Sequence, residues 1–221
     1  MQTIEQTYIK YKNKVEKNIT NDGISTDRGR FILTFNEAQN KWIEFHLQQR
    51  GVDDVRYIQN FLVLDKKIPY SSKLEDHYNF LLPKNYLDLS SLIPLASKGN
   101  CKDKKLTDIF ELQTENLSEI LQDEYNKPSF KWRASFYTIN SNTISVYVDD
   151  FSVDNILLNY YRYPNQIKQI NIEDPESDFD ESIQLEWDDK SLDRIISLAA
   201  GEFDLNSNNP RFQLQNLRQQ K

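Results

Sequence analysis

The sequence is poor in the residues that active sites and metal sites most often use. It has one cysteine, Cys101, which excludes an intrachain disulfide and fits a reducing compartment. It has two histidines, His46 and His77, and no second ligand follows His46 at a metal-binding spacing. Its five glycines form no phosphate-binding loop, and neither GxSxG nor HExxH occurs. We therefore expect no enzyme activity, no metal and no cofactor, with His46 packed in the core and Cys101 an exposed, inert thiol.

The sequence also lacks long apolar runs and an excess of positive charge. No run of eighteen apolar residues occurs, so no membrane span is expected. Residues 1–17 contain no apolar core of the signal-peptide type, so export by that route is not expected. The formal net charge is −7, which argues against a protein dedicated to binding nucleic-acid phosphates.

Large side chains for a core are plentiful, because the 221 residues include 12 Tyr, 12 Phe and 3 Trp. The most strand-like stretch is 130–164, in which apolar and polar residues alternate with a period of two. Residues 140–142 have turn composition, and a third apolar run over 156–163 ends at Pro164. This pattern predicts an antiparallel meander with one dry face, flanked by helices.

Two helices are predicted near the N-terminus. Over 3–20, apolar residues recur at spacings of three and four, and Thr3 with Gln6 fits a capping box. A second capping box, Thr34 with Glu37, predicts a helix that continues to about residue 49, before Gly51.

The middle of the chain gives weaker patterns. Residues 53–62 fit either a helix or a strand, and 65–128 is expected to be mostly irregular. Within it, 78–82 is a predicted strand that ends at a proline, and 116–121 a predicted short helix.

The last helix is predicted to start near residue 189 or 191. Its apolar residues fall on one stripe: Leu192, Ile195, Ile196, Ala199, Ala200 and Phe203. The tail that follows, 206–221, has three cations, no acid and few apolar residues, so it needs a partner in order to become ordered.

Residues 173–193 hold ten acidic side chains and one lysine, Lys190. The run DPESDFDE superficially resembles a calcium loop but lacks the required glycine and the closing glutamate. A solvated, self-repelling loop is the favoured interpretation. The alternative is that many copies line a channel, where carboxylates repel DNA and avoid gripping it. For Tyr160, Tyr161 and Tyr163, packing in a core or interface is favoured over a base-stacking platform.

These patterns predict an α+β fold: a helical body built from the N- and C-terminal helices, an inserted antiparallel β-sheet domain and an extended C-terminal tail. The expected divisions are a helical part (1–64), a β-rich insertion (65–172), an acidic segment with the last helix (173–205) and a docking tail (206–221).

The order of these features resembles the head–tail connector proteins (adaptor or ring proteins) of short-tailed bacteriophages, most of all those of crAss-like phages. The resemblance covers most of the chain from about residue 30. The segments that carry it are YNFLLPKNYLDL (78–89), LQDEYNKPSFKWR (121–133), SVYVDDF (145–151), ILLNYYRYP (156–164) and SLDRIISLAAGEF (191–203) with the following NPRFQLQ.

The resemblance implies a virion structural protein, assembled in the host cytoplasm as a dodecameric ring beneath the portal. It implies contacts with the portal, with neighbouring neck or tail rings and, transiently, with passing DNA. In that scheme the tail docks on the portal: Phe212, Leu214 and Leu217 anchor it, and Arg211 and Arg218 set its register. Trp132, Tyr161 and Tyr163 are the expected subunit or ring–ring contacts.

Two other functions stay open on the sequence. One is a lower neck or tail ring, or a stopper, without direct portal contact. The other is a soluble binding module of the bacterial host, in which the sheet presents a surface for a peptide or carbohydrate. Closed-ring assembly separates the two classes, because a host module has no reason to form rings.

Overall fold

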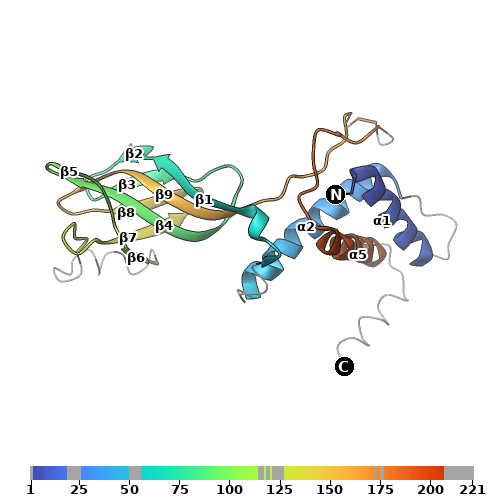
Figure 1. Cartoon of the computed structure of the whole chain (residues 1–221), viewed down its shortest axis with the longest axis horizontal. Coiled ribbons are helices and arrows are strands. Elements are labelled where there is room, and N and C mark those ends of the chain that lie inside the picture. The colour runs from blue at the N-terminus through green and yellow to red at the C-terminus, as the bar shows by residue number, and fades with distance from the viewer. Residues whose placement is uncertain are drawn as a thin grey trace, which may run out of the picture. The chain divides into compact units, whose positions relative to one another are not determined.

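The computed structural model describes residues 2–18, 26–49, 56–113, 117, 120, 127–171, 173–174 and 177–206. The fold is α+β, as the sequence predicts. The chain divides into two compact units (Figure 1). The helical unit comprises Met1–Asn60 and Pro164–Lys221, and the β unit comprises Phe61–Tyr163. The β-rich part expected from the sequence was 65–172.

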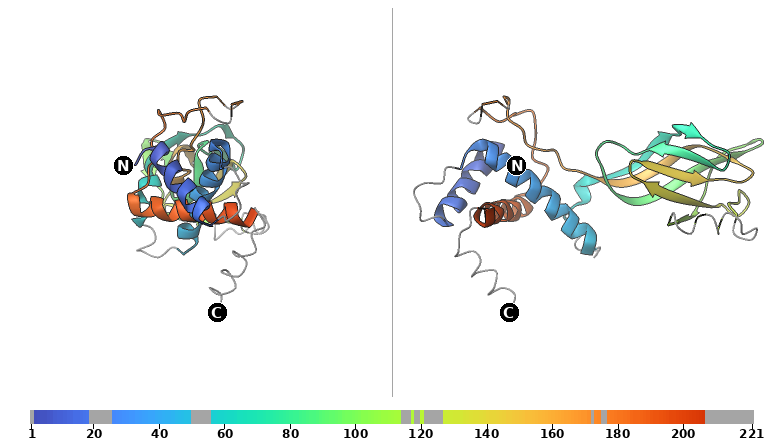
Figure 2. Two further views of the ribbon diagram at one scale, coloured as in Figure 1. Left: turned by 90° about the vertical axis from the view of Figure 1, so that its right-hand side faces the viewer. Right: turned by 180° about the vertical axis from the view of Figure 1, so that it is seen from behind.

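The helical unit contains α1 (Ile4–Asn18), α2 (Arg28–Gln49) and α5 (Asp189–Asn206). α5 packs against both α1 and α2 (Figure 2). The apolar stripe that predicts α5 is buried, as far as its side chains are described, at Leu192, Ile195, Ile196, Ala199 and Ala200. Burial of one apolar face of each helix is therefore the main stabilising contribution in this unit.

The predicted start of α1 is confirmed and that of α2 is wrong. In α1, Gln6 N–H donates to Thr3 Oγ1 at 3.2 Å and Thr3 N–H to Gln6 Oε1 at 3.1 Å, which is a capping box. α2 begins at Arg28 because Asp27 caps it: Arg30 N–H donates to Asp27 Oδ1 at 2.6 Å. Thr34 lies inside α2, where its hydroxyl donates to the Arg30 carbonyl at 3.0 Å.

Two polar side chains of α2 hold the segment that returns from the β unit to α5. The Asn36 amide exchanges two hydrogen bonds, both 3.0 Å, with the backbone N–H and carbonyl of Ile167. The buried Gln39 accepts from Trp187 Nε1 at 2.7 Å and donates to Asn36 at 3.1 Å. A long connection without regular structure is thereby fixed to a helix at both ends.

The β unit consists of two sheets. Their strand orders are β1-β9-β4-β5 and β2-β3-β8-β7-β6. Neighbouring strands are antiparallel except β6 and β7, which are parallel. The strands are β1 (Leu62–Pro69), β2 (Ser72–Lys73), β3 (His77–Leu81), β4 (Tyr86–Lys98), β5 (Cys101–Lys105), β6 (Asp108–Glu111), β7 (Ala134–Asn140), β8 (Thr143–Tyr147) and β9 (Ser152–Arg162).

One apolar core joins the two sheets into a sandwich. It draws on both sheets, with Tyr78, Phe80, Ile144 and Val146 from one and Leu92, Ile156 and Leu158 among those from the other. Every second side chain of β3 and of most of β9 is buried, which is the period-two pattern of a strand with one dry face.

The sequence-based meander is wrong in its third strand. β7 and β8 form the predicted hairpin, with Asn140 paired to Thr143 across the turn. β8 then pairs with β3, whereas β9 lies between β1 and β4 in the other sheet. The first strand starts at Ala134 and not at Phe130, because 130–133 form a tight turn.

The expectation that 65–128 is mostly irregular is also wrong, because β1 to β6 fall there. Several of these strands are exposed and polar, such as β5 (CKDKK) at a sheet edge, so they lack the apolar alternation of a half-buried strand. The predicted strand at 78–82 is confirmed as β3. Of the stretch 53–62, the structure has a 3₁₀ helix at Gln59–Phe61, and β1 begins at Leu62. Most of the predicted helix 116–121 lies outside the described residues.

Candidate functional site

The residues expected to make contacts from the sequence are in different situations. Arg211, Phe212, Leu214, Leu217 and Arg218 lie outside the described residues. In the β unit, Trp132 is 74% exposed, Tyr163 is 37% exposed and Tyr161 is 7% exposed. Burial and the nearby Asp88 raise the pKa of the Tyr161 hydroxyl. Tyr161 is therefore packed inside the β unit. Trp132 is the most exposed of the three aromatic residues.

Trp132 stands on a tight, hydrogen-bonded loop. The backbones of Ser129 and Ala134 exchange two hydrogen bonds of 2.8 and 3.1 Å that close the loop. Arg133 has a φ of +57°, a left-handed conformation that a long side chain rarely adopts. The Arg133 carbonyl accepts from Thr107 N–H at 3.1 Å and from Asp108 N–H at 3.0 Å, which ties the loop to β6. The backbone that carries the exposed indole is therefore fixed.

One lysine lies on the Trp132 ring and a second lies on the neighbouring Phe130. Lys131 Nζ lies 5.2 Å from the indole centroid, within cation–π range. Lys104 Nζ donates to the Phe130 carbonyl at 2.9 Å and lies 4.4 Å from the Phe130 ring, which brings β5 to the loop. We call Trp132 with Lys131, together with Lys104 on the neighbouring Phe130, the Trp132 patch. Asp108, which starts the adjoining edge strand, is the carboxylate next to it.

The helical unit has a pocket of about 940 Å³ between the start of α1 and residues 178–185. Its apolar lining includes Ile4, Phe179, Ile183 and Leu185. Its charged lining consists of the carboxylates Glu5, Asp178, Asp180 and Glu181 and one cation, Arg28. We call this the acidic pocket, because four carboxylates face one guanidinium.

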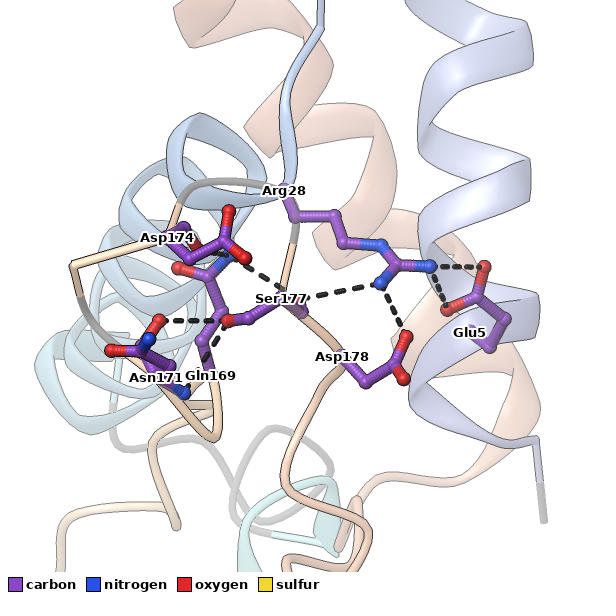
Figure 3. A network of polar contacts seen from close by, with 7 residues as sticks. All are labelled: Glu5, Arg28, Gln169, Asn171, Asp174, Ser177 and Asp178. Atoms are coloured by element: carbon purple, nitrogen blue, oxygen red, sulfur yellow. Dashed lines mark hydrogen bonds and ion pairs between the residues drawn. The ribbon is translucent and has the colours of Figure 1, made fainter.

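Arg28 holds the wall of the acidic pocket together (Figure 3). Its Nη1 donates to Asp178 Oδ1 at 2.7 Å and to the Ser177 carbonyl at 3.3 Å, while Nη2 donates to both Glu5 oxygens at 3.4 Å. The hydrogen bond with Asp178 raises the pKa of Arg28 above its ordinary value. The pair of contacts therefore links α1 to the acidic segment.

The rest of the wall is fixed by local hydrogen bonds. Ser177 Oγ donates to the Asn171 carbonyl at 2.7 Å, and Gln169 Nε2 approaches the Asp174 and Ser177 carbonyls at 3.4 and 3.5 Å (Figure 3). Ser182 donates to Asp180 through its hydroxyl at 2.6 Å and its N–H at 3.0 Å. These bonds lower the pKa of Asp180, so that carboxylate stays charged well into the acidic range.

The acidic segment is therefore more than the solvated loop expected from its charge. Phe179, Leu185 and Trp187 are buried and anchor it, while Asp178 and Glu181 are exposed. Arg28 is the residue that sequence reasoning missed. The spacing of apolar residues among acids, as in DFDE, was the only available sign that the segment packs.

His46 is in the core and Cys101 is exposed, as the sequence predicts. His46 is buried and its ring contacts those of Trp42 and Tyr57, as core packing requires. Among the described residues, no group of three or more His, Cys, Asp or Glu side chains is arranged to hold a metal ion. Within the same residues, no helix has the length and apolar character needed to cross a membrane.

The chain matches no protein-family model and no curated protein. The contact surfaces are therefore interpreted from their own geometry and charge.

Proposed function

We propose that the protein is a structural component of a virion: a head–tail connector that forms a ring beneath the portal, links capsid to tail and encloses part of the DNA channel. In this proposal the helical unit is the ring body, the β unit is an inserted domain that contacts neighbours, and residues 206–221 are the extended tail that docks on the portal.

The observation that carries the proposal is where the connector-like segments fall in the fold. Residues 78–89 cover β3 and the start of β4, 156–164 cover much of β9, and 191–203 fall in α5. β9 is a central strand of its sheet, and α5 packs on the two helices from the other end of the chain. The segments that resemble connector proteins therefore include a central strand of the β unit and the helix that packs on the other two helices of the helical unit.

Surface chemistry adds support. The Trp132 patch and the acidic pocket have opposite charges on one chain, and hydrogen bonds fix the backbone at each. Proteins that assemble from identical copies need such paired surfaces. The many carboxylates of 173–193 also suit the wall of a DNA channel, since like charges repel.

The test is co-assembly with the portal protein of the same virion, measured by size-exclusion chromatography with light scattering. We expect a ring of copies to co-elute with the portal. Deletion of 207–221, which leaves α5 intact, should abolish co-elution. A full-length variant with Phe212, Leu214 and Leu217 replaced by serine is the control. It shows whether binding depends on these apolar side chains or only on the presence of the tail.

The opposite results are equally informative. Ring formation without portal binding would favour a lower neck or tail ring. A monomer that neither binds the portal nor assembles in the presence of other tail proteins would contradict the proposal and favour a host binding module.

A further inference from the structure

Trp132 has the largest exposed fraction, 74%, among the large apolar side chains that the structure describes. Its loop is closed by backbone hydrogen bonds and tied to β6, so docking costs it little conformational entropy. Rigid, exposed Trp residues flanked by Arg or Lys are typical of binding hot spots. Trp132 therefore has the properties of a side chain that inserts into a pocket on a partner.

The acidic pocket has matching properties. At about 940 Å³ it has room for an indole and neighbouring side chains, and its lining includes Ile4, Phe179, Ile183 and Leu185. Carboxylates at Glu5, Asp178, Asp180 and Glu181 exceed the single Arg28, so the pocket attracts cations. The indole of Trp132, with Lys131 over its ring and Arg133 next to it in the sequence, combines an apolar surface with positive charge, which is the complement of this lining.

We propose that the Trp132 patch of one copy docks in the acidic pocket of a second copy, so that copies join head to tail. The inference rests on the proposed function in that it supplies the subunit contact of the ring. Its partner is a second copy because one chain carries both complementary surfaces, in separate units. Each copy then gives one contact and receives one, and such a heterologous interface closes into a ring when the rotation between copies allows it.

Two other occupants of the pocket are weaker fits. DNA is repelled by four carboxylates. The tail 206–221 also carries cations beside apolar residues, with Arg211 next to Phe212 and Leu217 next to Arg218, but it has no Trp between two cations. Both remain outcomes of the experiment.

The contact can be tested with unaltered protein. Equal amounts of ¹⁵N-labelled and unlabelled chain, mixed with the portal protein at low salt, are treated with a carbodiimide, which joins amines directly to adjacent carboxylates. We expect links from Lys131 to Asp180 or Glu181. Half of these links should combine a labelled with an unlabelled peptide, because the contact is between copies.

Substitutions then test the parts of the contact. Trp132→Ala should lower the yield of the link about tenfold or more, as for a hot-spot aromatic. Leu64→Ala is the matched control, because Leu64 is also on the β unit and 64% exposed but lies outside the patch. Both side chains are exposed, so circular dichroism should be unchanged.

A mixing experiment fixes the head-to-tail geometry. Trp132→Ala lacks the inserted side chain, and Asp180→Lys with Glu181→Lys lacks two carboxylates of the pocket. Neither variant alone should assemble. Their mixture can form one intact contact and no second, so a species of two copies and nothing larger is expected.

The other outcomes decide separately on this interface and on the connector function. Links only between peptides of one isotope would indicate a contact within a chain. Links from Lys221 to the pocket would make the tail its occupant. A ring on the portal that is unaffected by these substitutions would leave the connector function in place and remove this interface. Head-to-tail pairs without any ring or portal binding would support the interface and contradict the connector function.

Discussion

Single side chains connect parts of this chain that are far apart in sequence. Arg28 bridges Glu5 and Asp178, and Asn36 and Gln39 hold Ile167 and Trp187. None of these partners could be predicted from the sequence, because the spacing of residues along the chain says nothing about contacts between different elements of the fold. Local contacts could be predicted: the capping box of Thr3 and Gln6 lies within four residues.

Tyr137 gives a prediction about pH. Its hydroxyl donates to Glu111 at 3.2 Å, and burial, with help from Glu111, raises its pKa to about 12. The pKa of a tyrosine in an unfolded chain is about 10. The folded state thus holds the proton more tightly, so its stabilising contribution is complete below about pH 10 and is lost as the pH rises towards 12. We expect Tyr137→Phe to reduce the loss of unfolding free energy between pH 9 and about 11.5, measured in urea.

The control for this prediction separates its two causes. Glu111→Gln keeps a hydrogen-bond acceptor but removes the charge, so the tyrosine absorbance near 295 nm should still rise late, though earlier than in the wild type. Equal losses of stability in wild type and Tyr137→Phe would contradict the assigned environment. Tyr86, whose pKa burial also raises to about 12, accounts for part of the remaining loss.

At the scale of elements, periodicity predicts what is local. α1, α5 and the β7–β8 hairpin follow from apolar spacing and turn residues. The pairing of β9 does not follow, because an alternating pattern is satisfied by any neighbour strand. Its partners are β1 and β4, with Leu62 opposite Tyr161 in the register, and the buried side chains of β9 belong to a core that both sheets share. Edge strands such as β5 escape detection because both their faces are polar.

The β7–β8 turn makes a second prediction. Ser141 has a φ of +51° at the first of the two loop residues, a position where hairpins favour glycine. Ser141→Gly should raise the unfolding free energy of the β unit by about 0.5–1 kcal/mol, because relief of the left-handed strain exceeds the entropy that glycine loses. Chemical denaturation followed by tryptophan fluorescence measures the change.

Position matters in this test. Asn142→Gly, at the next residue, has no positive φ to relieve and should be neutral or destabilising. Ser141→Val should destabilise, because β-branched side chains tolerate this conformation worst. A stabilising Asn142→Gly would show that the turn has another geometry.

At the scale of the molecule, the β unit has the properties of an independent domain. The paired strands β1 and β9 bring its two ends together, with Leu62 opposite Tyr161, and its core is built from its own residues. We expect the fragment 61–163 to fold alone and to unfold cooperatively in urea.

Core substitutions provide the control for the fragment. Leu158→Ala, at a side chain with 0% exposure, should lower its unfolding free energy by about 2–5 kcal/mol. Leu64→Ala, at an exposed side chain, should leave it nearly unchanged. A fragment without a cooperative transition would mean that the sandwich needs the rest of the chain.

The α+β class could be predicted from the sequence. Trp132 became a contact candidate only through the resemblance to connector proteins, because its place in an alternating apolar run predicted a strand residue, whereas the structure has it 74% exposed on a turn. The two-sheet sandwich and the acidic pocket could not be predicted. The pocket exists only because 178–185 pack beside the start of α1, and their charge pattern alone favours solvation.

The exposed Cys101 on β5 offers a direct way to count copies. Because it is the one thiol of the chain, a spin label attached through a thioether would mark every copy once, at the same place. In a closed ring of identical copies, the ratios between the successive label-to-label distances depend only on the number of copies. A set of pulsed dipolar distances from singly labelled protein would therefore report the stoichiometry of the assembly without an image of it.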